Sequence, residues 1–94
     1  MENGGEKKIK VLIADDQTIL AEGIKSVLET DEGLETVGIA CDGADALEKC
    51  RVWRPDVVLM DIRMPNMNGV VATQRIKSEF PDTKVVVLTT FDDS

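Results

Sequence analysis

The residues of this chain with the clearest chemical potential are three aspartates that each follow an apolar segment. Asp15 and Asp16 come directly after the segment 9–14, and Asp61 comes directly after the segment 57–60. If these segments are neighbouring parallel strands, their carboxyl ends meet at one edge of a sheet, where ligands bind in open α/β sheets. Three carboxylates placed there repel one another at pH 7, so either a pKa rises or a cation binds.

The metal site predicted from these residues is built from oxygen ligands. Such a site favours a hard cation, Mg²⁺ before Ca²⁺. The chain has no histidine, and the spacing of Cys41 and Cys50 matches no usual zinc motif. The backbone carbonyl of Arg63, in the turn-rich stretch after Asp61, could complete the coordination and leave a position for a substrate oxygen. This arrangement suits phosphoryl transfer, with a carboxylate oxygen attacking phosphorus in line.

Each polar residue at this edge also has a purely structural interpretation. An aspartate between a strand and a helix is often a helix cap, and Asp16 or Thr18 could cap the helix that begins at Thr18. Thr89 and Thr90 could simply finish a strand, where threonine is common. Beside three carboxylates, however, a hydroxyl at the end of that strand would face phosphoryl oxygens. The coincidence of three acidic groups at one edge favours the functional interpretation.

Composition restricts the size of the fold and the class of partner. The 94 residues, 43% hydrophobic and 31% charged, suffice for one small domain with one core. A net charge of -7 argues against direct binding to nucleic acid, which relies on cationic side chains. No apolar run approaches the roughly 18 residues of a membrane span, and no signal-peptide pattern is present. We therefore expect a cytoplasmic protein with reduced cysteines.

Strand and helix patterns alternate along the chain. Apolar, β-branched segments predict strands at 9–14, 34–40, 57–60 and 84–89, of which the second is the most polar and suits a sheet edge. Helical periodicity predicts helices from Thr18 to about Thr30, from Ala44 to a point before Arg54, and from Asn68 to Phe80. The expected buried stripes are Leu20, Ile24, Val27 and Leu28 in the first helix, Ala44, Leu47 and Cys50 in the second, and Gly69, Ala72, Ile76 and Phe80 in the third.

This alternation predicts an α/β fold with a parallel sheet. Right-handed crossovers give the strand order 2-1-3-4. We expect residues 1–8 to be a flexible tail that precedes the domain at 9–94. In that order the first helix covers one face and the other two helices cover the opposite face. Strands three and four then have one apolar face without a helix, and strand four is an open edge. We expect self-association through strand four or by exchange of elements.

Three segments resemble the receiver domain of bacterial two-component response regulators. They are VLIADDQ, VVLMDIRMPNMNG and VVVLTTFDD, and together the matching parts run from about residue 9 to residue 94. The first is a weak motif by itself, whereas the M-D-I-R-M-P-x-M-x-G run is highly specific. The stretches DDQTILAEGIKSVLE and LTTFDDS look most similar to receivers that precede a LuxR-type helix-turn-helix domain. The resemblance implies a flavodoxin-like, doubly wound fold.

The resemblance also implies a role for each matching residue. Asp61 would accept a phosphoryl group from a sensor histidine kinase. Asp15 and Asp16 would hold Mg²⁺ together with Asp61, and Arg63 would lend its backbone carbonyl. Thr89 would be the switch hydroxyl whose movement alters a surface read by a DNA-binding output domain. The chain would thus be a phosphorylated regulator rather than an enzyme acting on a separate substrate.

The C-terminal part of the family pattern is not matched. Receivers continue through a fourth helix, a fifth strand that supplies a lysine to the phosphoryl group, and a fifth helix. The resemblance therefore predicts a truncated receiver with weakened phosphorylation, since one cationic partner is worth a few kcal/mol where charge develops. DNA would be reached only through an output domain outside this sequence. In the part that matches, Pro65 and Gly69 would shape the loop after the acceptor.

Two other functions are compatible with parts of the pattern. A Mg²⁺-dependent phosphohydrolase also uses an aspartate nucleophile, but it usually has an acidic residue two positions later, where this chain has Arg63. A flavodoxin-type binding module needs a phosphate-cradling loop after the first strand. The residues there, Asp15, Asp16 and Gln17, suit a phosphate poorly in the absence of a metal.

Overall fold

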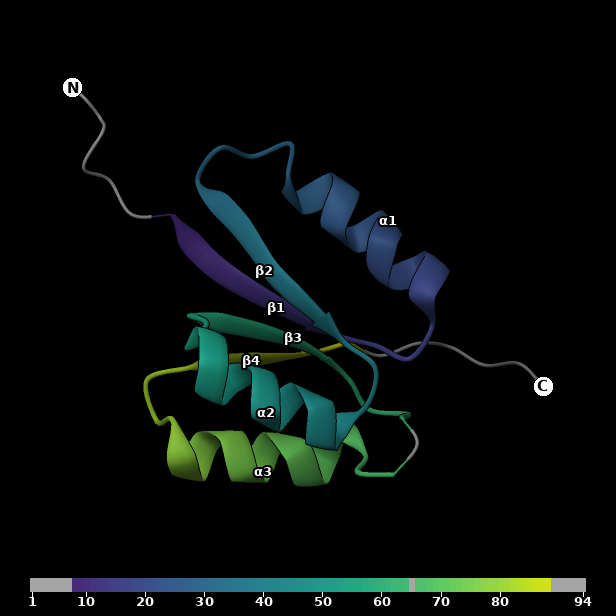
Figure 1. Cartoon of the computed structure of the whole chain (residues 1–94), viewed down its shortest axis with the longest axis vertical. Coiled ribbons are helices and arrows are strands. Elements are labelled where there is room, and N and C mark those ends of the chain that lie inside the picture. Colours follow the sequence, from purple (N-terminus) through teal and green to yellow (C-terminus); the bar gives the residue numbers. More distant parts are fainter. Residues whose placement is uncertain (1–7, 65, 89–94) are drawn as a thin grey trace.

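Four parallel strands alternate with three helices in the computed structural model, which describes residues 8–64 and 66–88 (Figure 1). In chain order these elements are β1 (Ile9–Ala14), α1 (Thr18–Leu28), β2 (Leu34–Ala40), α2 (Gly43–Trp53), β3 (Val57–Asp61), α3 (Gly69–Glu79) and β4 (Lys84–Leu88). The strands lie in the order β2-β1-β3-β4, which confirms the predicted topology and places β1 and β3 side by side.

The three helices cover the two faces of the sheet unequally (Figure 1). Helices α2 and α3 lie together on one face, and α1 lies on the other. The core between the sheet and the α2–α3 layer consists of Leu12, Ala14, Ala40, Ala46, Leu47, Cys50, Val58, Met60, Met64, Ala72 and Ile76. Helix α1 contacts β1 and β2 and no other described element. The prediction that β3 and β4 have one face without a helix is therefore confirmed for the described residues.

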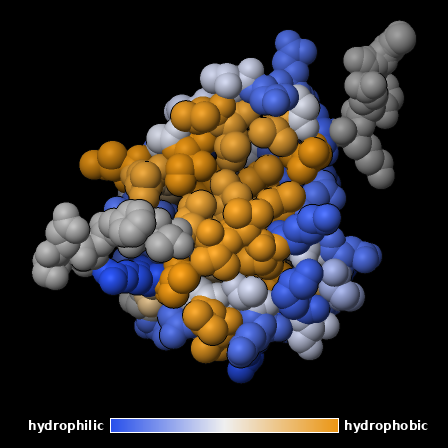
Figure 2. Space-filling model, turned by 180° about the vertical axis from the view of Figure 1, so that it is seen from behind, coloured by the Kyte–Doolittle hydropathy of each residue, from blue (hydrophilic) through white to orange (hydrophobic). Residues whose placement is uncertain are grey.

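Exposure increases across this uncovered face from the centre of the sheet to β4. Ile13, Leu59 and Val86 are neighbours in the strand register and point to the same side. Ile13 is fully buried beneath α1, Leu59 is half-buried, and Val86 is 48% exposed. The view from the side opposite α2 and α3 shows a continuous hydrophobic surface (Figure 2). Residue types suited to a covered, central sheet are thus partly open to solvent here.

Helix α1 begins without the predicted side-chain cap. Its N-cap residue is Gln17, and no side chain caps the first turn, so the expectation that Asp16 or Thr18 would do so is wrong. Asp15, the residue directly after β1, accepts a hydrogen bond at Oδ1 from the Gln17 N–H at 2.9 Å. This bond holds the turn before the helix and does not cap the first helical turn.

The buried side of α1 is also rotated from the predicted stripe. Ala21 is fully buried, and Ile24 and Leu28 are half-buried. Leu20 is 37% exposed and Val27 is 68% exposed, although both were expected to face the sheet. A small residue at the point of closest approach lets the helix lie near the sheet. The larger apolar residues then flank the contact instead of filling it.

The second and third helices agree closely with the predicted ranges. Helix α2 ends where Arg54 adopts a left-handed conformation, with φ at 48°, immediately before a proline, as expected. It begins one residue earlier than predicted, and Ala44 is exposed rather than buried. Helix α3 is capped by Asn68, whose side chain accepts a hydrogen bond from the Val71 N–H at 3.0 Å.

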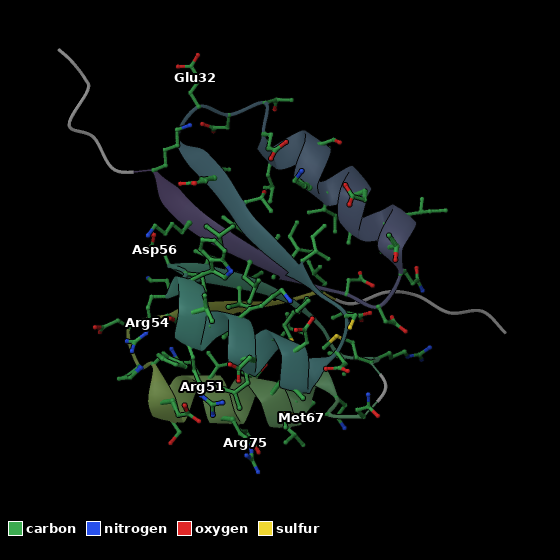
Figure 3. The ribbon with its side chains drawn as sticks, in the orientation of Figure 1. Glu32, Arg51, Arg54, Asp56, Met67 and Arg75 are labelled. Carbon is green, nitrogen blue, oxygen red and sulfur yellow. The ribbon has the colours of Figure 1, made fainter. Side chains whose placement is uncertain are left out.

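The α2–α3 layer is joined at its solvent side by an ion pair. Arg51 of α2, labelled in Figure 3, contacts Glu79 of α3, with 3.0 Å between Arg51 Nη2 and Glu79 Oε2. Such exposed pairs contribute little to stability, so the layer depends mainly on its apolar contacts. Among the described residues, no helix is both long enough and apolar enough to cross a membrane.

Both cysteines are free thiols. Cys41 is exposed, whereas Cys50 is buried in the core. Burial, with a smaller contribution from the charge of Glu79, raises the pKa of the Cys50 thiol to about 11. Cys50 is therefore protonated at neutral pH and acts as a small core residue.

Candidate functional site

The ends of β1 and β3 bring the three predicted aspartates together. Ala14 and Met60 are partners in the register of β1 and β3, so the next residue of each strand, Asp15 or Asp61, emerges at the same edge of the sheet. Asp15 is 1% exposed and Asp61 is 2% exposed, whereas Asp16 is exposed. One carboxylate oxygen from each of the three lies within 4.8 Å of the others. Two buried acids and one exposed acid thus form a single cluster.

Backbone hydrogen bonds hold the two buried carboxylates in place. Asp15 Oδ1 accepts from the Gln17 N–H, and Asp61 Oδ1 accepts from the Arg63 N–H at 3.2 Å. Asp15 Oδ2, in contrast, is buried and has no hydrogen-bond partner among the described residues. An unpaired buried acceptor is costly, and a cation among the three carboxylates would remove that cost. The donor set therefore fits a hard divalent cation.

The electrostatics of Asp15 lead to the same conclusion. Burial raises the pKa of the Asp15 carboxyl group, and the negative charges of Asp61 and Asp16 raise it further, while the hydrogen bond from Gln17 acts in the opposite direction. Ionising Asp15 is therefore less favourable than ionising an aspartate in water. A divalent cation acts in the opposite direction, because it favours the charged form of every carboxylate beside it.

Close backbone packing shapes the loop that follows Asp61. The Gly69 N–H donates to the Ile62 carbonyl at 3.0 Å, which brings the end of the loop back to its start. A Cβ atom on Gly69 would overlap the Asp61 carbonyl oxygen and lie 2.7 Å from the Ile62 Cα. Glycine is needed here for close backbone approach and not for an unusual dihedral angle. The packing fits the loop-shaping role expected of Gly69.

The remaining predicted residues differ in what the structure shows of them. Arg63 contacts Asp61 through its backbone N–H, and the metal-binding role of its carbonyl stays a prediction. Thr89 lies outside the described residues, as does Pro65. The roles of Asp15, Asp16 and Asp61 as ligands and acceptor also stay predictions, although their proximity is a structural fact.

Sequence reasoning missed a second group of residues near the site. Asp42 and Gly43, at the start of α2, contact Asn66 and Met67 in the loop after Asp61. The sequence signal was present, because Asp-Gly marks a turn and asparagine tolerates a left-handed conformation. Nothing in a single sequence indicated that these two turns touch.

Comparison with known protein families decides the classification. A family model described as the response regulator receiver domain matches residues 11–94, which is most of the chain. The chain belongs to this receiver-domain family. The resemblance expected from the three sequence motifs is thereby confirmed, and receiver domains of this kind are regulatory units rather than enzymes.

The relatives to which this receiver domain is similar include regulators of transcription. The transcriptional regulatory protein LnrK of Bacillus subtilis is 50% identical over 86 residues, which cover 92% of this chain and 39% of LnrK. A DNA-binding response regulator of the LuxR family from Staphylococcus aureus is 28% identical, with a TM-score of 0.82 over 89% of this chain and 70% of that chain. The expected similarity to LuxR-type regulators is confirmed.

A third relative was solved in complex with other molecules. It is a chain of the CheX–CheY–BeF₃–Mg²⁺ complex from Borrelia burgdorferi, which is 25% identical with a TM-score of 0.83. The match covers 97% of this chain and 69% of that one. The present receiver domain therefore spans about two fifths of LnrK and about two thirds of each of these two solved chains.

Proposed function

We propose that this receiver domain is a phosphorylation-dependent signalling switch in which Asp61 accepts a phosphoryl group in the presence of Mg²⁺. The observation that carries the proposal is the carboxylate cluster at the ends of β1 and β3, with the orphaned Asp15 Oδ2 within it. Three oxygen ligands of this kind suit Mg²⁺, which binds one or two carboxylates and keeps several waters. The proposed acceptor is the buried Asp61, because it stands in the segment VVLMDIRMPNMNG, which resembles the acceptor segment of receiver domains.

Each residue of the cluster has a distinct task in the transfer. Asp15 and Asp16 hold the ion, and the Arg63 N–H orients the carboxylate of Asp61. An Asp61 oxygen then attacks phosphorus in line and forms a new O–P bond. The P–N bond of a phosphohistidine breaks, and its electron pair returns to the imidazole of the donor. Mg²⁺ supplies positive charge that offsets the charge on the phosphoryl oxygens.

The proposed partners are inferred from the phosphohistidine donor and from the names of the relatives. The donor is a sensor histidine kinase, and Thr89 is the hydroxyl that contacts the phosphoryl group after transfer. We further propose that an output domain outside this sequence binds DNA. The Staphylococcus aureus relative is named a DNA-binding response regulator, and LnrK is named a transcriptional regulatory protein, which supports this proposal. The CheX–CheY complex contains BeF₃ and Mg²⁺, which supports the same pair of ligands here. We propose a cytoplasmic location from the sequence pattern alone.

Labelling with a small acyl phosphate tests this function against the phosphohydrolase alternative. With Mg²⁺ and acetyl phosphate, intact-mass spectrometry should detect a single added phosphoryl group, and Asp61→Asn should remove it. Asp56→Asn is the matched control, because Asp56 is an exposed aspartate immediately before the same strand and should not affect labelling. Many turnovers of a simple phosphate ester by the wild-type chain would instead favour the phosphohydrolase.

We also propose that the 94-residue chain associates with a second copy of itself. Two observations on the described residues support this proposal, namely the hydrophobic surface formed in part by Leu59 and Val86, and the outer edge of β4, where no described strand pairs. An apolar edge strand presents unpaired backbone groups to another strand. Pairing between two β4 strands, or exchange of elements between copies, would satisfy these backbone groups and bury part of the hydrophobic surface.

A further inference from the structure

The loop between Asp61 and α3 is attached to the beginning of α2 by two hydrogen bonds. The Gly43 N–H donates to the Met67 carbonyl at 2.8 Å, and the Asn66 Nδ2 donates to Asp42 Oδ2 at 2.9 Å. Met67, labelled in Figure 3, is half-buried and packs against the hydrophobic core. Two turns that are far apart in the sequence thus form one contact beside the carboxylate cluster.

Asp42 has a different partner for each of its carboxylate oxygens. Oδ1 accepts from the Asp45 N–H at 2.7 Å and caps α2, while Oδ2 accepts from Asn66. These two hydrogen bonds hold the pKa of Asp42 below its usual range, and the bond from the Asp45 N–H has the larger effect on that pKa. The side chain therefore stays ionised at neutral pH and joins a rigid helix end to the loop.

The backbone on both sides of this contact is specialised for it. Asn66 has a φ of 64°, a left-handed conformation that asparagine adopts more readily than most residues. A Cβ atom at Gly43 would overlap the Met67 carbonyl oxygen and lie 2.8 Å from the carbonyl carbon. The two segments are thus as close as their backbones allow.

We propose that the hydrogen bond between Asp42 and Asn66 is a clamp that positions the loop after Asp61. The loop carries Arg63, whose N–H binds Asp61 Oδ1, and it is closed on the other side by Gly69. Held at both points, it keeps the Arg63 backbone directed at Asp61. Asp42 and Asn66 are therefore positioning residues, which act on the site through the loop and do not touch the phosphoryl group.

The consequence for the site rests on the proposed function. If the loop supplies a backbone ligand to Mg²⁺ and orients Asp61, loss of the clamp should weaken Mg²⁺ binding. Residues that orient metal ligands from outside the coordination shell typically change affinity by about 10- to 100-fold. An exposed pair has water as an alternative partner, so we expect a smaller loss of about 3- to 10-fold. The clamp itself does not depend on any metal.

Asp42 could instead serve only as the cap of α2, and chosen variants separate the two roles. Asp42→Ser keeps a good N-cap residue but is too short to reach Asn66. Asn66→Gly keeps the positive φ and the net charge while removing the donor. The exchanged pair Asp42→Asn with Asn66→Asp restores a hydrogen bond with the partners reversed. Asn is also a good cap, so only the clamp is rebuilt.

Two measurements on the intact chain test the clamp. The first is amide hydrogen exchange at Gly43 and Arg63 without Mg²⁺, and the second is the Kd for Mg²⁺ by calorimetry. Asp42→Ser and Asn66→Gly should each accelerate exchange at both amides and raise the Kd, and the double variant should be no worse than either single. The exchanged pair should return both quantities to within about twofold of wild type. Unchanged exchange in the single variants, or additive effects in the double variant, would overturn the clamp.

The proposed function can fail separately from the clamp. If the wild-type chain does not bind Mg²⁺, the proposed metal site is wrong, and the exchange data alone decide the clamp. Faster exchange in both single variants with recovery in the exchanged pair would then support it. If Mg²⁺ binds but none of the variants alters exchange or Kd, the metal site stands and the clamp is rejected.

Discussion

Asp15→Asn is expected to stabilise the metal-free receiver domain and to remove most of its response to Mg²⁺. Asparagine keeps the acceptor for the Gln17 N–H. It replaces Oδ2, which has no hydrogen-bond partner, by an amide NH₂ group that can donate to the neighbouring carboxylates. Relieving one unsatisfied buried group is worth on the order of 1 kcal/mol. For a domain of this size, that corresponds to a rise in Tm of roughly 4–8 °C.

The pH dependence of this effect follows from the raised pKa of Asp15. Between the unfolded-state pKa, about 3.9, and the higher folded-state pKa, the folded protein holds a proton that the unfolded chain has released. Stability contributed by this group is therefore greatest at low pH and falls as pH rises through that window. The advantage of Asp15→Asn should grow over the same window and then remain constant.

Urea unfolding of wild type and Asp15→Asn from about pH 4 to pH 8, with and without Mg²⁺, measures both effects. Asp16→Asn is the matched control, because Asp16 belongs to the same cluster but is exposed. It should weaken the response to Mg²⁺ while changing metal-free stability much less. An Asp15→Asn variant that is less stable than wild type at neutral pH would contradict the electrostatic account of the site.

The 94-residue chain is expected to form a dimer or larger species at tens of micromolar, and Val86→Lys is expected to make it monomeric. Val86 lies on β4, at the exposed side of the face that α1 leaves uncovered, and is 48% exposed. A lysine there would place a charge inside any contact formed through this surface. Charged residues on edge strands oppose strand pairing in the same way.

Light scattering coupled to size exclusion provides the mass of each variant. Val52→Lys is the control, since Val52 is 64% exposed on α2, which makes no contact with β4, and the substitution should leave the mass unchanged. A monomeric mass for the wild-type chain at these concentrations would argue against association through β4. Equal masses for wild type and Val86→Lys would place the contact elsewhere.

The parts of the fold that the sequence predicted are those with strong periodic or steric signals. Arg54 before a proline predicted the end of α2, and Asn68 before a helical repeat predicted the start of α3. The strand order followed from right-handed crossovers between parallel strands. Because Asp15 and Asp61 each follow an apolar strand, their proximity followed from that order without knowledge of any side-chain contact.

The features that sequence reasoning missed depend on contacts between distant segments. The hydrophobic periodicity of α1 does not specify how far the helix is rotated, so Val27 was expected to be buried and is exposed. Ala21, which faces the sheet, was not part of the expected stripe because alanine gives a weak hydrophobic signal. The contact of Asp42 with Asn66 joins two turns, and each turn is recognisable alone but carries no information about its partner.

Thermal unfolding with Mg²⁺ and beryllofluoride tests the central claim most directly, namely that the three aspartates bind a cation and that Asp61 then accepts a phosphoryl group. Mg²⁺ should raise the Tm of the wild-type chain, and beryllofluoride should raise it further only when Mg²⁺ is present. A ligand at one hundred times its Kd stabilises by about 2.7 kcal/mol. Asp61→Asn should lose the beryllofluoride increment. The same increment in Asp61→Asn, or no response of the wild type to Mg²⁺, would contradict the account.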